Sequence, residues 1–154
     1  MKIIILTVGK IKNRLFREAV LQYLDRASKY VTLEWIVVPD TAQKGAAASS
    51  LAREGESILK KIGKRDYVVL LDERGKELES KEFSLWVERK LSKIQGKMIF
   101  VIGGPYGVSD RVKHRADFLL SFSKMTFPHE LCAVLLSEQL YRICTIKAGT
   151  GYHH

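Results

Sequence analysis

The sequence predicts an α/β fold in a single domain, with a mostly parallel sheet flanked by helices. Apolar segments alternate five times with segments of helical periodicity. The length of 154 residues and the hydrophobic share of 46% suit one domain with its own core. No repeat or low-complexity linker divides the chain, so we expect one domain over residues 1–154.

The first strand, helix and second strand follow from the apolar pattern of the N-terminal part. Residues 2–8 (KIIILTV) form a continuous apolar run rich in β-branched side chains, which is typical of a strand covered on both faces. From Leu15 to Ala27, apolar residues recur at spacings of three and four, which predicts an amphipathic helix. Residues 31–38 (VTLEWIVV) predict the second strand.

A helix, a strand and a turn are predicted next. The Ala-rich residues 41–50 predict a loop or a frayed helix start, and helical periodicity then runs over residues 51–62 up to Gly63. The apolar run at residues 67–71 (YVVLL) predicts the third strand. The sequence DERG at residues 72–75 predicts a turn directly after that strand.

Another helix and the fourth strand follow this turn. Ser80 is a suitable N-cap for a helix that carries apolar residues up to Leu91, and Gly96 is expected to close it. Residues 97–102 (KMIFVI) then predict the fourth strand.

The C-terminal part predicts the fifth strand between two helices. Ser109 is expected to cap a short helix, and residues 118–122 predict the fifth strand. After a loop at residues 123–127, Pro128 suits the first turn of a long helix that runs to about Lys147.

The chain is basic, with a net charge of +9 and a pI near 9.6. Residues 1–65 contain 13 of the 26 Lys and Arg residues but only 6 of the 17 Asp and Glu residues. Four of these basic residues follow the first strand closely: Lys10, Lys12, Arg14 and Arg17. This excess favours an anionic partner, although a solvated helix face gives the same pattern.

Several function classes lack their motifs. The first strand is followed by Gly9 alone, so the G-x-G-x-x-G dinucleotide fingerprint is missing. A P-loop and a G-x-S-x-G nucleophile elbow are also absent from the sequence. The four His and two Cys residues show no zinc-ligand spacing, so we expect no metal site.

The sequence also favours a cytoplasmic protein. No apolar run approaches the roughly 20 residues of a membrane span, so we expect no membrane association. The N-terminal apolar stretch is too short for a signal peptide. Cys132 and Cys144 fall on one predicted helix, about 18 Å apart, which predicts two reduced, buried thiols rather than a disulfide.

The most glycine-dense loop, GGPYG at residues 103–107, directly follows the fourth predicted strand. Glycines there allow a ligand to approach the backbone closely, although for this loop taken alone a tight turn into the next helix is the favoured explanation. Leu71-Asp72 and residues 121–127 also follow strands. Because ligands bind beyond the carboxyl ends of parallel strands, these three loops could form one pocket.

Four segments together resemble one known family: IGGPYG (102–107), LSFSKMTFPH (120–129), SEQLYR (137–142) and GYHH (151–154). They resemble the ribosomal RNA large subunit methyltransferase H family, which are small members of the SPOUT (α/β-knot) superfamily. The resemblance covers the whole chain, including VGK at residues 8–10 and EGE at residues 54–56.

This resemblance implies a C-terminal trefoil knot, S-adenosylmethionine as cofactor and a homodimer with sites near the subunit interface. It implies methylation of N3 of a pseudouridine in 23S ribosomal RNA on the assembled ribosome. The last predicted helix carries apolar residues that suit such a dimer interface, although packing on the chain's own sheet would also explain them: Leu131, Val134, Leu135, Leu140, Tyr141 and Ile143.

The matching positions also imply site residues. The cofactor-contacting positions are Leu71, Gly103, Phe122, Ser123, Lys124, Met125, Thr126 and Phe127. Leu71 and Phe127 could hold adenine between apolar side chains, and Gly103 has no side chain to collide with a ligand.

On the substrate side, the resemblance implies Glu138, Arg142 and His153 as catalytic residues. Glu138 and Arg142 are at i and i+4, where a purely structural ion pair is the competing explanation. His153 is the hypothesised base that removes the N3 proton, although a terminal His pair is also typical of a disordered tail. His154 stands where the family usually has a basic residue.

Two alternatives stay open from the sequence. One is a non-catalytic RNA-binding or ribosome-associated α/β protein, and the other is a knot methyltransferase that acts on transfer RNA. The small size argues against the second, because the chain has no appended RNA-binding domain.

Overall fold

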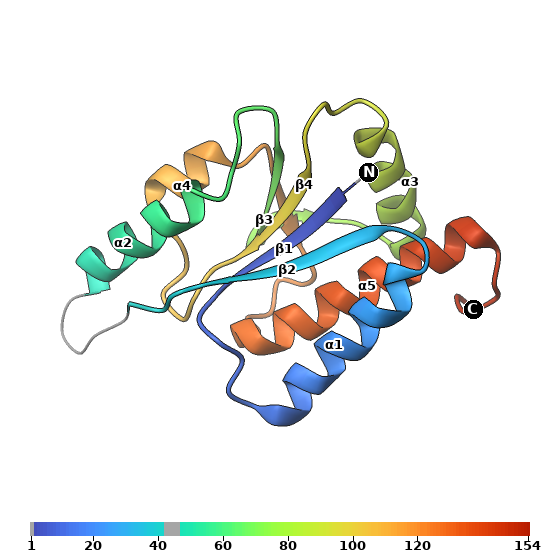
Figure 1. Cartoon of the computed structure of the whole chain (residues 1–154), viewed down its shortest axis with the longest axis horizontal. Coiled ribbons are helices and arrows are strands. Elements are labelled where there is room, and N and C mark those ends of the chain that lie inside the picture. Colours follow the sequence, from blue (N-terminus) through green and yellow to red (C-terminus); the bar gives the residue numbers. More distant parts are fainter. Residues whose placement is uncertain (1, 42–46) are drawn as a thin grey trace.

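The computed structural model describes residues 2–41 and 47–154, which form one sheet with helices on both sides (Figure 1). The elements in chain order are β1 (Lys2–Val8), α1 (Arg14–Ser28), β2 (Thr32–Val38), α2 (Ala47–Leu59), β3 (Tyr67–Glu77), α3 (Ser80–Leu91), β4 (Met98–Ile102), α4 (Asp110–Arg115), β5 (Phe118–Ser121) and α5 (His129–Ala148).

The five strands form one parallel sheet in the order β2-β1-β4-β3-β5. Phe100 of β4 pairs with Ile5 of β1 on one side and with Val69 of β3 on the other. The predicted α/β class with a parallel sheet is therefore confirmed. The trefoil knot implied by the family resemblance stays a prediction.

Alternation along the strands divides the core between the two faces of the sheet. Ile3 and Ile5 pack on the face covered by α1, α3 and α5, whereas Ile4 and Leu6 pack on the face covered by α2 and α4 (Figure 1). Because both faces are covered, β1 is apolar throughout, as its sequence predicts. No helix in the described part of the chain is long and apolar enough to cross a membrane.

The end of β3 differs from the prediction. The strand does not end at Leu71 with a turn at residues 72–75 but continues to Glu77, because Leu71 and Lys76 both pair with Leu120 of β5. The intervening residues bulge out of the ladder. A Cβ at Gly75 would lie 2.6 Å from the backbone of Leu119, so only glycine fits this close approach.

Helix boundaries also differ in α2 and α3, and α2 ends at Leu59 rather than at residue 62. Glu79, not Ser80, is the N-cap of α3, and the Glu82 carboxylate accepts a hydrogen bond from its N–H at 3.0 Å. This helix ends at Leu91, before Gly96. The helix predicted from residue 51 begins at Ala47, and residues 42–46 of the loop predicted before it lie outside the described residues.

Side chains form hydrogen bonds between the segments at the amino edge of the sheet. The Asp66 carboxylate, just before β3, accepts hydrogen bonds from the N–H groups of Gly63 (2.7 Å) and Lys97 (2.8 Å). Arg115 donates to the carbonyl oxygens of Gly63 and Asp66 and to the Asp117 carboxylate. The amino ends of β3, β4 and β5 are therefore joined through their main chains.

The Asp66 carboxyl is ionised in this setting. Burial opposes its charge, but the N–H groups of Lys97 and Gly63 and the Lys97 ammonium outweigh burial and hold the pKa of Asp66 below its ordinary value. The amino edge thus contains a buried charge that the main chain stabilises.

Candidate active site

A cavity of about 800 Å³ opens at the carboxyl edge of the sheet. It is formed by the bulge of β3, the loop after β4 and the loop after β5, as the sequence predicts for one shared pocket. Seven of the eight residues expected to contact a cofactor lie in its wall: Leu71, Gly103, Phe122, Ser123, Met125, Thr126 and Phe127. The eighth, Lys124, is exposed and is not part of the wall.

The glycine loop after β4 is both a tight turn and a wall of the cavity. The N–H of Gly107, at a φ of 81°, donates to the carbonyl oxygen of Gly104 at 3.0 Å. A Cβ at Gly103 would lie 2.7 Å from the carbonyl oxygen of Gly107 and 2.8 Å from Val108. Gly103 is therefore required by the loop's own backbone, whereas the sequence-based argument concerned a collision with a ligand.

The loop after β5 is bonded to the bulge of β3. Thr126 donates its hydroxyl to the Glu73 carboxylate at 3.0 Å, and Ser121 donates to the carbonyl oxygens of Glu73 (3.2 Å) and Ser123 (2.8 Å). These contacts fix two walls of the cavity relative to each other. Glu73 was not expected from the sequence, because its partners lie about 50 residues away.

The cavity wall combines apolar side chains with charged groups. Asp72 and Glu73 lie on one side, and Lys113 also reaches the wall. Hydrogen bonds and the charge of Arg74 hold the pKa of Asp72 below its ordinary value. Such a volume, with apolar walls and a few polar groups, is typical of sites for nucleotide-sized ligands.

A buried carboxyl group lies behind the glycine loop. Glu54 of α2 is 4% exposed, and its Oε2 lies 3.7 Å from the Cβ position of Gly104. Its partners are the hydroxyl of Ser50 at 3.4 Å, the N–H of Thr41 and the Asp40 carboxyl. Burial and the neighbouring Asp40 raise the pKa of Glu54 above its ordinary value.

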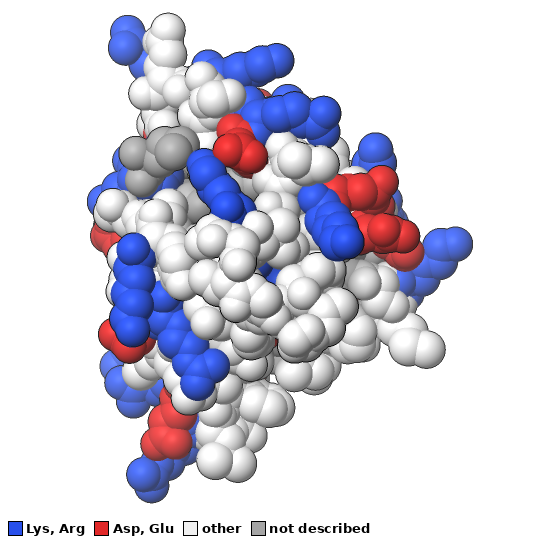
Figure 2. All heavy atoms as spheres, turned by 90° about the vertical axis from the view of Figure 1, so that its right-hand side faces the viewer, with Lys and Arg blue, Asp and Glu red and all other residues white. Residues whose placement is uncertain are grey.

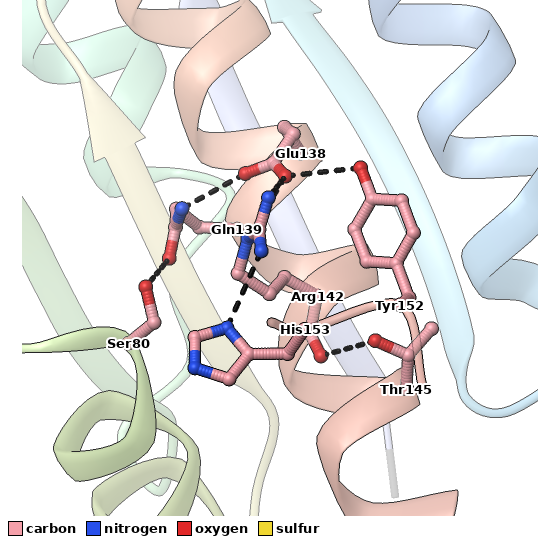
Figure 3. A network of polar contacts seen from close by, with 7 residues as sticks. All are labelled: Ser80, Glu138, Gln139, Arg142, Thr145, Tyr152 and His153. Atoms are coloured by element: carbon pink, nitrogen blue, oxygen red, sulfur yellow. Dashed lines mark hydrogen bonds and ion pairs between the residues drawn. The ribbon is translucent and has the colours of Figure 1, made fainter. Parts of the chain in front are cut away.

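The three residues expected on the substrate side lie together on α5 and the C-terminal tail (Figure 3). Glu138 Oε1 accepts from Arg142 Nη2 at 2.6 Å and Nε at 3.0 Å, which confirms the expected ion pair. Arg142 Nη1 lies 3.3 Å from Nδ1 of His153. The tail is thus in contact with α5 up to His153, whereas His154 is exposed.

Three further residues complete this cluster, and the sequence analysis did not assign them. Tyr152 donates its hydroxyl to Glu138 Oε1 at 3.1 Å, and Gln139 Nε2 donates to Glu138 Oε2 at 2.8 Å. Ser80 of α3 donates to Gln139 Oε1 at 2.8 Å. Burial and the Glu138 charge raise the pKa of Tyr152 to about 12, so its hydroxyl stays a donor. Gln139 and Tyr152 fall within the motifs quoted above, but Ser80 lies 59 residues from its partner.

A smaller cavity of about 320 Å³ lies between this cluster and the large cavity. Ser80 and Gln139 lie in its wall, and it shares four residues with the large cavity: Leu120, Ser121, Phe122 and Phe127. Glu138, Arg142 and His153 line neither cavity. The structure therefore brings the expected cofactor residues together and the expected catalytic residues together, in two adjoining groups.

Metal ligands do not gather in the described ranges: His, Cys, Asp and Glu side chains form no group of three or more that could hold an ion there. Cys132 and Cys144 are free thiols on α5, as predicted, but both are half-buried rather than buried. Burial raises the pKa of Cys144 to about 11, which makes it unreactive.

Relatives of known name match this chain along its whole length. The protein named ribosomal RNA large subunit methyltransferase H in Parabacteroides distasonis is 40% identical to this chain, over 100% of this chain and 99% of the relative. The proteins of this name in Streptococcus agalactiae and Carboxydothermus hydrogenoformans are each 42% identical, over 99% of both chains.

Solved structures share the fold. A probable methyltransferase from Bordetella pertussis Tohama I has a TM-score of 0.56 at 12% identity, over 93% of each chain. A probable methylase family protein from Haemophilus influenzae Rd KW20 has a TM-score of 0.51 at 15% identity, over 99% of this chain and 70% of the other. The sequence profile described as "Predicted SPOUT methyltransferase" matches residues 1–153. The chain therefore belongs to the SPOUT methyltransferase family.

Proposed function

We propose that this protein transfers a methyl group from S-adenosylmethionine to N3 of a pseudouridine in large-subunit (23S) ribosomal RNA, on the assembled ribosome in the cytoplasm. The observation that carries the proposal is the cavity formed by three strand-end loops in a chain of a methyltransferase family. The names of the full-length relatives support ribosomal RNA as the substrate class.

The residues in the cavity wall fit this cofactor. Leu71, Phe122 and Phe127 offer apolar surfaces for the adenine ring, and the backbone around Gly103 offers N–H and C=O groups for its polar edge. The Glu73 carboxylate suits the positive charge of a sulfonium group. When bound, S-adenosylmethionine supplies an electrophilic methyl group.

The cluster on α5 would bind the acceptor nucleotide. Arg142 carries a fixed positive charge, as guanidinium groups do in proteins, and the hydrogen bonds and charge of Glu138 raise its pKa above the ordinary value. A guanidinium group suits both an RNA phosphate and the face of a base. The adjoining small cavity brings this cluster, through Gln139, next to the wall shared with the cofactor cavity.

A homodimer would cover the exposed side of α5. Leu140 and Ile143 are buried in the chain's own core, so packing on its own sheet explains these two. Four other apolar residues remain only half-buried: Leu131, Val134, Leu135 and Tyr141. A helix that is apolar around most of its circumference is normally covered on all sides, which supports a partner subunit. Sedimentation of the protein should give a dimer, and a stable, active monomer would contradict it.

The basic surface supports binding to RNA. Lys10, Lys12, Arg14 and Arg17 are all exposed around the start of α1. On the face of the molecule at the right of Figure 1, Lys and Arg side chains, with several Asp and Glu side chains among them, lie along the top, left and right of an uncharged central area (Figure 2). A distributed positive surface of this kind suits a polyanion.

The test uses ribosomes from a strain that lacks the gene. Purified protein and S-adenosylmethionine with a labelled methyl group are added to assembled ribosomes, to isolated large-subunit RNA and to transfer RNA. We expect label only in the ribosome sample, and mass spectrometry should place it on N3 of one pseudouridine. Label in transfer RNA would favour the alternative substrate, and calorimetry without any binding of S-adenosylmethionine would favour a non-catalytic RNA-binding protein.

A further inference from the structure

The geometry around His153 determines which ring nitrogen carries its proton. Nδ1 faces Arg142 Nη1 at 3.3 Å, and a guanidinium group only donates hydrogen bonds. Nδ1 must therefore accept, so the proton of the neutral ring is on Nε2. In Figure 3 the second ring nitrogen points away from Arg142, and no residue in the described ranges accepts a hydrogen bond from it.

The guanidinium that sets this tautomer is itself held by Glu138, which further side chains hold in place. Glu138 Oε1 takes two N–H groups of Arg142, while Glu138 Oε2 is occupied by Gln139. Side chains at i and i+1 of a helix do not face each other, so the Gln139 side chain must be held in position from outside α5 to bond to Glu138. Ser80 of α3 supplies it by donating to the Gln139 amide oxygen at 2.8 Å.

We propose that His153 acts as a hydrogen-bond donor through Nε2–H to a carbonyl oxygen of the acceptor base, and not as the base that removes the N3 proton. This inference rests on the proposed function. The sequence-based expectation gave His153 the role of base, which requires an accessible ring nitrogen with a free electron pair. Here the only such pair faces Arg142.

The chemistry of an imide suits a donor at this position. N3 of a uracil-type ring lies between two carbonyl groups, and loss of its proton to water spreads negative charge over their oxygens. The N3 electron pair then forms the new bond to the methyl carbon, and the pair of the broken C–S bond stays on sulfur as a neutral thioether. An N–H group aimed at one of the carbonyl oxygens would stabilise the developing charge.

The test compares two replacements of His153 in the full-length protein on ribosomes. His153→Gln keeps an N–H donor at about the position of Nε2 but cannot act as a base near pH 7, whereas His153→Ala removes both properties. We expect kcat to fall less than about 10-fold for His153→Gln and about 10²–10³-fold for His153→Ala. Equal losses in the two variants would overturn the proposal.

A second measurement needs no substrate. Nitrogen NMR of the free protein, with histidines labelled and His153→Gln used for assignment, reports which nitrogen of the neutral ring carries the proton. We expect the proton on Nε2, and a proton on Nδ1 would overturn the proposal. Failure of the wild-type protein to methylate ribosomes would refute the proposed function instead, and it would leave the NMR result unchanged.

Discussion

Two buried carboxyl groups lie at opposite edges of the sheet, and their pKa values are shifted in opposite directions. Asp66, 8% exposed at the amino edge, accepts two backbone N–H groups, and its pKa lies below the ordinary value. Glu54, 4% exposed at the carboxyl edge, lies against Asp40 and the glycine loop, and its pKa lies above the ordinary value. The same type of group is stabilised as an anion at one edge and as a neutral acid at the other.

This difference separates the edge that holds the fold from the edge that holds the ligand cavity. The Asp66 carboxylate accepts from the main-chain N–H groups of Gly63 and Lys97, and the Arg115 side chain donates to the Asp66 carbonyl oxygen, so these bonds restrain the segments that precede β3, β4 and β5. Glu54 lies against Gly104 of the glycine loop, and burial and Asp40 outweigh the Thr41 N–H and the Ser50 hydroxyl that favour its charged form. We expect substitutions at the first edge to lower stability, whereas substitutions at the second edge should change binding or, at Glu54 itself, raise stability.

The largest effect is expected for Asp66→Ala. The change removes the acceptor of the Gly63 and Lys97 N–H groups, which are only partly buried, so we expect a loss of about 2 kcal/mol in the free energy of unfolding. Urea denaturation followed by circular dichroism measures it. Cofactor affinity of the folded fraction should stay unchanged, because the cavity lies at the other edge.

The control is Asp25→Ala, which removes the same charge from an exposed position on α1. Its unfolding free energy should change by less than about 0.5 kcal/mol. If Asp66→Ala were no more destabilising than this control, the amino edge would not be the stabilising region.

A smaller effect, on cofactor binding rather than on stability, is expected for Gly103→Ala. The new Cβ meets the carbonyl oxygen of Gly107 at 2.7 Å, so the turn must move and the cavity wall with it. We expect about tenfold weaker binding of S-adenosylmethionine by calorimetry, which corresponds to about 1.4 kcal/mol. Gly104→Ala is the matched variant, because its Cβ would meet Val8 at an ordinary 3.4 Å. An equal loss of affinity in both would show that the close approach at Gly103 is not the cause.

The sequence predicted the strands, the long C-terminal helix and the three-loop cavity because these depend on local apolar patterns and on where strands end. It did not predict the Asp66 contacts, since Lys97 lies 31 residues away and no local pattern marks a side chain that binds distant backbone. The continuation of β3 was missed for a similar reason. DERG is a good turn sequence, and β3 continues beyond it only because Lys76 and Glu77 pair with β5, which is distant in sequence. The position of His153 against Arg142 depends on how the tail folds back, which spacing cannot give.

The smallest effect is expected for Glu54→Gln, and it depends on pH. Because the pKa of Glu54 is raised in the folded protein, folding favours the protonated acid. The stability contributed by this group is therefore present below the ordinary value of 4.5 and is lost as pH rises through the higher folded pKa. Glutamine imitates the protonated acid, since its amide can donate to Asp40 and cannot ionise.

We therefore expect Glu54→Gln to stabilise the protein by about 0.5–1 kcal/mol at pH 7 and to have no effect near pH 4. Urea denaturation of both proteins between pH 4 and pH 8 measures the difference. Glu56→Gln is the control, because Glu56 is exposed and paired with Arg111, so its removal should lower stability slightly at pH 7. A Glu54→Gln variant that is less stable than the wild type at pH 7 would mean that the anion is the favoured form. Both edges would then stabilise a buried carboxylate anion, and the proposed difference between them would be wrong.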